Sequence, residues 1–248
     1  MIDCLEAVRD NDPYKTALLS PIRAARLRME VLDHAKRIPE PRRQAHSIPS
    51  QLIQDLDEAE EPADIVRHEL QLVSAAELAR SLEHNGIASL VADLPLCSPS
   101  MTFVLDELLP VIVVSRRHGV EQRRFTLARE LAAFYIDRQS PVDLTAAKSR
   151  FAGALLMPRV PLFIEAKDGF DEGKVIRLSR EFGVSTMALL CRLEVLCLTT
   201  NWTITDAAAW DRSGGAAARQ RGTQLGALGT PRPAVGRLSS RLRHGVAT

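Results

Sequence analysis

The spacing of hydrophobic and polar residues predicts helices on either side of a small sheet. Two helical segments are predicted between residues 58 and 86, the second beginning with a capping box formed by Ser74 and Glu77. Three short runs rich in β-branched residues then predict strands: 87–92, 101–105 and 110–114. Helical spacing returns in three later segments: 120–136, 143–156 and 171–196. This order of helices, a small antiparallel sheet and further helices predicts an α+β fold.

The two ends of the chain differ from this patterned middle. Residues 1–57 combine one predicted helix, around 21–37, with proline breaks and little apolar material, which indicates a partly helical leader or linker. Residues 211–248 contain seven arginines and one aspartate without any periodicity, which predicts a disordered basic tail. Between them we predict a main domain over residues 58–165 and a helical subregion over residues 166–210 that packs on it.

Composition narrows the class of protein. Hydrophobic residues make up 46% of the chain and charged residues 25%, as is typical of a globular protein. A net charge of +1 and only 4% aromatic residues argue against nucleic acid as the partner. The sequence has neither an apolar run of membrane-spanning length nor an N-terminal signal pattern, which predicts a cytoplasmic location and no membrane contact. The four cysteines form no C-x-x-C pair, so we expect buried free thiols.

The segment RFTLARELAAFYID, residues 125–138, is similar to a zinc-binding helix that lacks its ligands. In the motif H-E-x-x-H, two histidines four residues apart on a helix bind one zinc ion, and the glutamate polarises the bound water. Here Glu130 is present, but Arg129 and Ala133 occupy the two histidine positions. A guanidinium group stays protonated and offers no lone pair, and a methyl group offers no ligand atom.

Three segments, in the same order, resemble motifs of the ImmA/IrrE family of zinc metallopeptidases. They are RRFTLARELAAFYID, RFAGALLMPRVPLF and LSREFGVSTMALLCRLEVL, and the resemblance covers about residues 58–200. The family typically shows RRFTLAHELGHxLLH, then EAxxFAAxLLMP, then LAxxFGVSxxALxxRL. The resemblance implies a zincin-like metallopeptidase fold with an active-site helix. It also implies a role in phage or mobile-element immunity and in stress responses. In these processes the family regulates transcription by cleaving repressors or antitoxin-like transcription factors.

Carried over residue by residue, the resemblance implies that all three zinc ligands are missing. The two histidines correspond to Arg129 and Ala133, and the third ligand, a glutamate, corresponds to Ala147 or Thr145. Only Glu130 matches, as a vestigial general base. We therefore expect no cofactor, where intact family members hold zinc. The favoured hypothesis is a catalytically inactive homologue that acts as a regulatory or protein-binding module, with a protein such as a transcriptional repressor as its partner.

Two alternatives stay open at this point. The first is an active zinc endopeptidase with non-standard ligands that cleaves a transcriptional repressor. The second is a DNA-binding regulator that uses residues 171–196, where a turn at Gly183 and an N-cap at Ser185 give the spacing of a helix-turn-helix. In that case the second helix would offer Thr186, Met187 and Arg192 to the major groove. The leucines of this segment favour packing against the main domain instead. Metal content tests the first alternative, and salt-dependent DNA binding tests the second.

Overall fold

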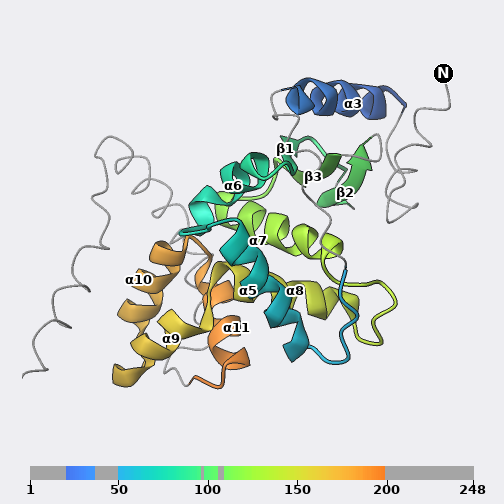
Figure 1. Cartoon of the computed structure of the whole chain (residues 1–248). Coiled ribbons are helices and arrows are strands. Elements are labelled where there is room, and N and C mark those ends of the chain that lie inside the picture. The colour runs from blue at the N-terminus through green and yellow to red at the C-terminus, as the bar shows by residue number, and fades with distance from the viewer. Residues whose placement is uncertain (1–20, 37–49, 96–97, 106–108, 199–248) are drawn as a thin grey trace, which may run out of the picture. The chain divides into compact units, whose positions relative to one another are not determined.

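The computed structural model describes residues 21–36, 50–95, 98–105 and 109–198 (Figure 1). All of these residues belong to one compact unit. The predicted tail at residues 211–248 lies outside the described residues, so it stays a prediction, as do the domain boundaries. Among the helices that the structure describes, none has both the length and the apolar character to cross a membrane.

A three-stranded sheet lies at the centre of the fold, and its strands are β1 (Ala88–Ala92), β2 (Ser100–Leu105) and β3 (Leu109–Ser115). Strand β3 is the middle strand and is buried along its whole length, as expected of a continuous apolar run. It pairs with β2 in antiparallel fashion and with β1 in parallel fashion. The α+β class is confirmed, but the sheet is mixed and the prediction of a wholly antiparallel sheet was wrong. The hairpin uses one edge of β3, and β1 fills the other edge in the same direction as β3.

Helix α3 (Pro21–Ala35) covers one face of the sheet (Figure 1). Its Val31 and Ala35 are buried in one hydrophobic cluster with residues of all three strands. The strand residues in this cluster alternate along each strand, because successive side chains point to opposite faces. They are Ala88, Leu90, Ala92, Met101, Phe103, Leu109, Val111 and Val113. The predicted N-terminal helix therefore supplies apolar side chains to the core.

Helix α7 (Val120–Leu131) lies against β2 and β3 and continues into the short helix η3 (Ala132–Phe134). Helix α8 (Leu144–Leu156) packs against α7, and Asp143 caps it by accepting a hydrogen bond from the Thr145 amide. Helix α5 (Glu60–Glu69) packs on α8, and α6 (Leu78–His84) lies beside β1. Two 3-10 helices precede α5 and α6: η1 (Asp57–Ala59) and η2 (Ala75–Glu77).

The described chain ends with three helices, α9 (Arg159–Glu165), α10 (Glu172–Phe182) and α11 (Thr186–Val195), and η4 (Ala166–Asp168) follows α9. The predicted turn between α10 and α11 is confirmed. Gly183 has a φ of 69°, a left-handed conformation that glycine adopts without strain. Ser185 caps α11 by accepting a hydrogen bond from the Ala188 amide.

Two cysteines are exposed, so the prediction of buried thiols was wrong for them. They are Cys191 and Cys197, and both are free. Cys191 lies on the outer side of α11, because its neighbours Leu190 and Arg192 occupy the buried side of that helix. Cys4 and Cys97 lie outside the described residues.

Candidate functional site

Glu130 is the one residue of the predicted site that keeps its expected side chain, and α7 buries it against strand β2. Its residue surface is 7% exposed. The hydroxyl of Ser100 donates to Oε1 at 2.6 Å, and the hydroxyl of Thr102 donates to Oε2 at 2.8 Å. Ser100 and Thr102 are two positions apart on a strand, so their side chains point to the same face. Each carboxylate oxygen of Glu130 is therefore engaged by a hydroxyl of the sheet.

Arg129 precedes Glu130 but extends toward solvent. Its side chain is 30% exposed, against 9% for the side chain of Glu130. Its Nη2 atom lies 3.9 Å from Oε1 of Glu130, a distance that allows electrostatic attraction but is too long for a hydrogen bond. The position that the sequence resemblance assigns to the first zinc histidine thus holds a partly exposed cation.

The other three predicted ligand positions differ in their surroundings. Ala133 is half-buried in η3, so it follows the end of α7 rather than continuing that helix. Ala147 is completely buried in α8, whereas Thr145 is exposed in the first turn of the same helix. The two candidates for the third ligand position are thus distinguished by burial: a glutamate at 147 would start inside the core, and one at 145 would start at the surface.

Helix α11 buries two of the three side chains that the DNA-binding alternative requires. Thr186 is buried and the Arg192 side chain is only 2% exposed, whereas Met187 is half-buried. Arg192 donates from Nη1 and Nη2 to the two carboxylate oxygens of Glu60, at 2.6 and 2.9 Å. Its Nε donates to the carbonyl of Met157 at 3.1 Å. Arg192 is therefore committed to the domain interior and is not available to bases. Sequence reasoning missed Glu60, because no local pattern signals a partner 132 positions away.

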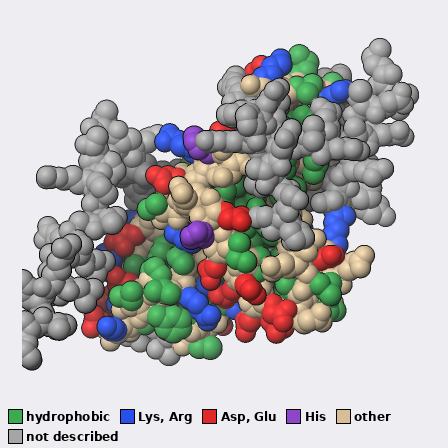
Figure 2. Space-filling model, in the orientation of Figure 1, with side chains coloured by type: hydrophobic (Ala, Val, Ile, Leu, Met, Phe, Trp, Pro, Cys, Tyr) green, Lys and Arg blue, Asp and Glu red, His purple; other side chains and the backbone are tan. Residues whose placement is uncertain are grey.

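The face of the molecule that Figure 2 shows does not favour binding of nucleic acid. Acidic side chains gather on this face around the start of α5. The exposed acids of this segment are Asp55, Asp57, Glu58, Glu61 and Asp64. Such a surface repels phosphate.

Comparison with known proteins identifies the region that contains these residues. Residues 98–194, from the loop before β2 to the last turn of α11, match the model of the Peptidase_M78 family, the IrrE N-terminal-like domain. Residues 98–194 are therefore similar to an IrrE N-terminal-like domain. This domain includes Ser100, Thr102, Arg129, Glu130 and Arg192, and the resemblance inferred from the sequence is confirmed.

One solved structure that the chain resembles is that of a Mycobacterium tuberculosis transcriptional regulator. The two share 22% sequence identity with a TM-score of 0.42, and the match covers 56% of this chain and 46% of that one. This chain therefore matches less than half the length of that protein. No curated protein matches the sequence.

The residues of this IrrE N-terminal-like domain do not fit zinc at the expected position. Zinc takes imidazole nitrogen, thiolate sulfur or carboxylate oxygen. The corresponding residues here offer a guanidinium, two methyl groups and a hydroxyl, and both oxygens of Glu130 accept hydrogen bonds. Within the part of the chain that the structure describes, no three His, Cys, Asp or Glu side chains are grouped to hold a metal ion elsewhere.

His118 is the histidine nearest in sequence to the start of α7. Its buried Nδ1 atom has no hydrogen-bond partner within the described ranges. His118 belongs to no group of three possible metal ligands among those residues either.

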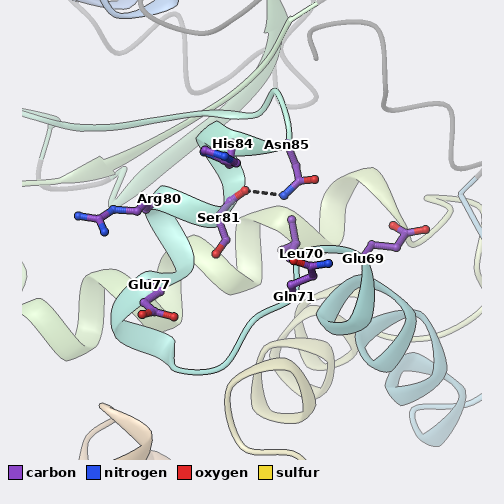
Figure 3. Close-up of a pocket in the computed structure, with 8 residues that line it drawn as sticks. All are labelled: Glu69, Leu70, Gln71, Glu77, Arg80, Ser81, His84 and Asn85. Carbon is purple, nitrogen blue, oxygen red and sulfur yellow. Dashed lines mark hydrogen bonds between the residues drawn. The ribbon is translucent and has the colours of Figure 1, made fainter. Parts of the chain in front are cut away.

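A polar hollow of about 590 Å³ lies away from these residues, between the end of α5 and helix α6 (Figure 3). Its lining carries both charges and several amides, and Asn85 Nδ2 donates to the Ser81 carbonyl at 2.8 Å. The lining residues are Glu69, Leu70, Gln71, Glu77, Arg80, Ser81, His84 and Asn85. None of the predicted site residues belongs to this lining, so the hollow is separate from the predicted peptidase site.

Proposed function

We propose that this IrrE N-terminal-like domain is a non-catalytic, regulatory protein-binding module. Its partner is a protein such as a transcriptional repressor or an antitoxin-like transcription factor, which the domain holds without cleaving it. The single observation that carries this proposal is the state of Glu130. Both of its oxygens accept hydrogen bonds from the sheet, and the residue before it is an arginine where the family has a metal ligand.

Peptide hydrolysis by a metallopeptidase needs an activated water molecule as its nucleophile. A zinc peptidase obtains its nucleophile by lowering the pKa of a metal-bound water from 15.7 to about 7. Arg129, Ala133, Ala147 and Thr145 supply no zinc ligand, so they support no such water. The domain therefore retains the fold but lacks the zinc ligands that peptide-bond hydrolysis would require.

Metal content is the first test of this proposal. Full-length protein purified without chelators is expected to contain far less than one zinc ion per chain by elemental analysis. An intact ImmA/IrrE peptidase prepared in parallel serves as the positive control. One tightly bound zinc ion per chain would overturn the proposal and would favour the alternative of an active endopeptidase with non-standard ligands.

Restoration of the ligands is the second test. The variant Arg129→His, Ala133→His, Ala147→Glu restores the donor types of a catalytic zinc site, two nitrogens and one carboxylate with a position left for water. A second version carries Thr145→Glu in place of Ala147→Glu, because the two positions differ in burial. Each version is compared with its single glutamate variant, which lacks the histidines.

We expect one triple variant to bind zinc more tightly than both the parent and its single-glutamate control, in titrations against a competing chelator. Cleavage activity need not return, since the groups that orient the ligands were not restored. If both triple variants fold and neither gains zinc affinity, these positions do not converge on one site. The loss of ligands would then no longer explain inactivity.

A further inference from the structure

The inference that follows rests on the proposed function, and it concerns what Arg129 does in place of a metal ligand. A guanidinium group has five N–H donors in a planar fork that matches a carboxylate. Among the residues that the structure describes, the one polar contact of the Arg129 side chain is its 3.9 Å approach to Glu130. Within those described residues, its N–H donors thus make no hydrogen bond.

Three other arginines of the domain use their donors internally. Arg124 donates to the carbonyl of Gly183 at 3.1 Å. Arg150, 18% exposed, lies 3.2 Å from Asp57 and 3.6 Å from Glu60. The buried Arg192 makes the three hydrogen bonds described above. Arg129 is less buried than Arg150 and differs from all three in having no hydrogen bond to the residues that the structure describes.

Glu130 does not remove this capacity of Arg129. Its carboxylate is oriented toward β2 by the hydroxyls of Ser100 and Thr102, at 2.6 and 2.8 Å. Those two bonds hold Glu130 on the buried side, while the Arg129 side chain reaches the exposed side. The nearby negative charge reduces the long-range attraction for anions. Recognition at Arg129 therefore depends on short-range hydrogen bonds to a ligand that can contact the guanidinium directly.

The helix surface around Arg129 adds a second element of recognition. Position i−4 lies on the same side of an α-helix, and here it is Phe125, which is half-buried in α7. An aromatic ring thus precedes the cation by one turn. This surface fits a peptide that has a carboxylate next to an apolar side chain.

We propose that Arg129 is a carboxylate-binding residue, so that the domain holds its protein partner through an acidic group beside an apolar residue. The carboxylate comes either from an aspartate or glutamate side chain or from the C-terminus of the partner. The residue that replaces a zinc ligand thereby changes the site from one that activates water to one that binds an anion.

The test is an NMR titration of the full chain labelled with ¹⁵N, following the arginine Nε–H signals and the backbone amides of residues 125–133. Three matched peptides serve as probes. N-acetyl-Leu-Glu-amide carries a side-chain carboxylate, N-acetyl-Leu-Gln with a free C-terminus carries a terminal carboxylate, and N-acetyl-Leu-Gln-amide carries neither. We expect at least one carboxylate peptide to bind about tenfold or more tightly than the uncharged peptide, because hydrogen bonds between ionised groups are the strong ones. The tighter of the two identifies the source of the carboxylate.

Arg129→Gln is expected to reduce binding of that peptide to the level of the uncharged peptide. Arg123→Gln is the matched control, because Arg123 is also half-buried in α7 but is six residues earlier and faces a different direction. It is expected to leave binding unchanged. Equal binding of all three peptides, or full binding by a folded Arg129→Gln variant, would overturn the proposal. If that variant does not fold, the comparison of the three peptides on the parent protein decides.

Zinc analysis of the same samples separates this inference from the proposed function. Stoichiometric zinc in the parent protein would overturn the non-catalytic reading, whatever the peptides do. If the protein contains no zinc and shows no preference for carboxylate peptides, the non-catalytic function still stands. Only the carboxylate-binding role of Arg129 would then be rejected.

Discussion

Glu130 and the two hydroxyls that contact it connect helix α7 to strand β2. Burying a carboxylate costs free energy unless hydrogen bonds replace those it made with water. Ser100 and Thr102 supply such bonds from one face of the strand. In this protein the glutamate of the family motif therefore contributes to the packing of the helix on the sheet, whatever chemistry it has in relatives that bind zinc.

The variant Thr102→Val tests this packing role. Valine has nearly the shape of threonine, but it removes the hydroxyl that donates to Oε2 of Glu130. We expect a loss of about 1–3 kcal/mol in the free energy of unfolding, the usual cost of removing one partner of a buried hydrogen bond to a charged group. Chemical denaturation measures it. Thr145→Ala, at an exposed position of α8, is the control and should change stability by less than about 0.5 kcal/mol. Equal effects of the two variants would contradict the role of the Thr102 hydroxyl.

At the scale of residues, the sequence indicated which residues belong to the candidate site but not which residues form hydrogen bonds with them. The motif around RFTLARELAAFYID identified Glu130, Arg129 and Ala133 as the residues to examine. It did not indicate that Ser100 and Thr102 engage the glutamate, because these donors lie 30 and 28 residues earlier. Side-chain hydrogen bonds between distant segments follow from the packing of a helix on a strand, which periodicity does not specify.

At the scale of the elements, the end of helix α8 has a particular construction. The last carbonyl groups of a helix have no partners within the helix. Here Arg67 of α5 donates to the Leu155 carbonyl at 2.5 Å, and Arg192 of α11 donates to the Met157 carbonyl at 3.1 Å. Two helices from distant parts of the chain thus satisfy the end of a third. Glu60 of α5 completes the arrangement by pairing with Arg192.

Removal of Arg192 should be costly for this reason. Arg192→Met leaves Glu60 buried without its main partner, and we expect a loss of about 3–5 kcal/mol in the free energy of unfolding. The matched control is Arg177→Met, because Arg177 also forms a two-fold ion pair, with Glu181, but on the exposed side of α10. That change should cost less than about 1 kcal/mol. Similar costs in both variants would mean that the Arg192 pair adds nothing beyond a surface ion pair.

The ion pair between Glu60 and Arg192 should also make the stability of the protein depend on pH in acid. Burial, the largest influence on Glu60, raises its pKa, but Arg192, Arg159 and Arg150 together bring the pKa below its ordinary value of 4.5. A carboxyl group with a lowered pKa in the folded state contributes stability above its unfolded pKa and loses it as the pH falls through the folded value. Below about pH 4.5 the parent protein should therefore lose stability more steeply than Glu60→Gln. Denaturant titrations at several pH values measure the two slopes, and equal slopes would contradict the lowered pKa.

The elements themselves were largely predictable, whereas their partners were not. The caps at Ser74 and Ser185 and the turn at Gly183 follow from local chemistry, and the structure has all three. The parallel pairing of β1 with β3 was missed, since alternation of apolar residues does not encode the direction of a neighbouring strand. Helix α9 was also missed, because it is short and Pro161 interrupts the apolar run.

At the scale of the whole molecule, the sheet lies between α3 on one face and α7 on the other, and α8 joins α7 to α5. The IrrE N-terminal-like match begins at residue 98 and so does not include α3, α5, α6 or β1. These elements nevertheless contribute core residues such as Val31, Val66, Leu82 and Leu90. The folded unit is therefore larger than the segment that identifies the family.

The C-terminal tail is expected to be independent of this unit. Residues 211–248 have no apolar periodicity, and they are rich in arginine, glycine and alanine. A chain truncated after residue 210 should keep the thermal midpoint of the parent to within about 2 °C, the shift that a change of roughly half a kcal/mol produces in a domain of this size. Calorimetry of the two proteins measures it. A large fall on truncation would show that the tail packs against the rest.

The ion pair between Glu60 and Arg192 also has a consequence for the order in which the protein is made. The two residues are 132 positions apart, so at about 5–20 residues per second a ribosome adds Arg192 roughly 7 to 26 seconds after Glu60. Once residue 157 has been added, the sheet, α7 and α8 are all synthesised, but the Glu60 carboxylate and the Met157 carbonyl still lack the Arg192 guanidinium that later bonds to both. The nascent domain therefore passes through a stage in which the residues of its sheet, α7 and α8 are present but the Glu60–Arg192 ion pair cannot form. That ion pair can form only after α11 has emerged from the ribosome.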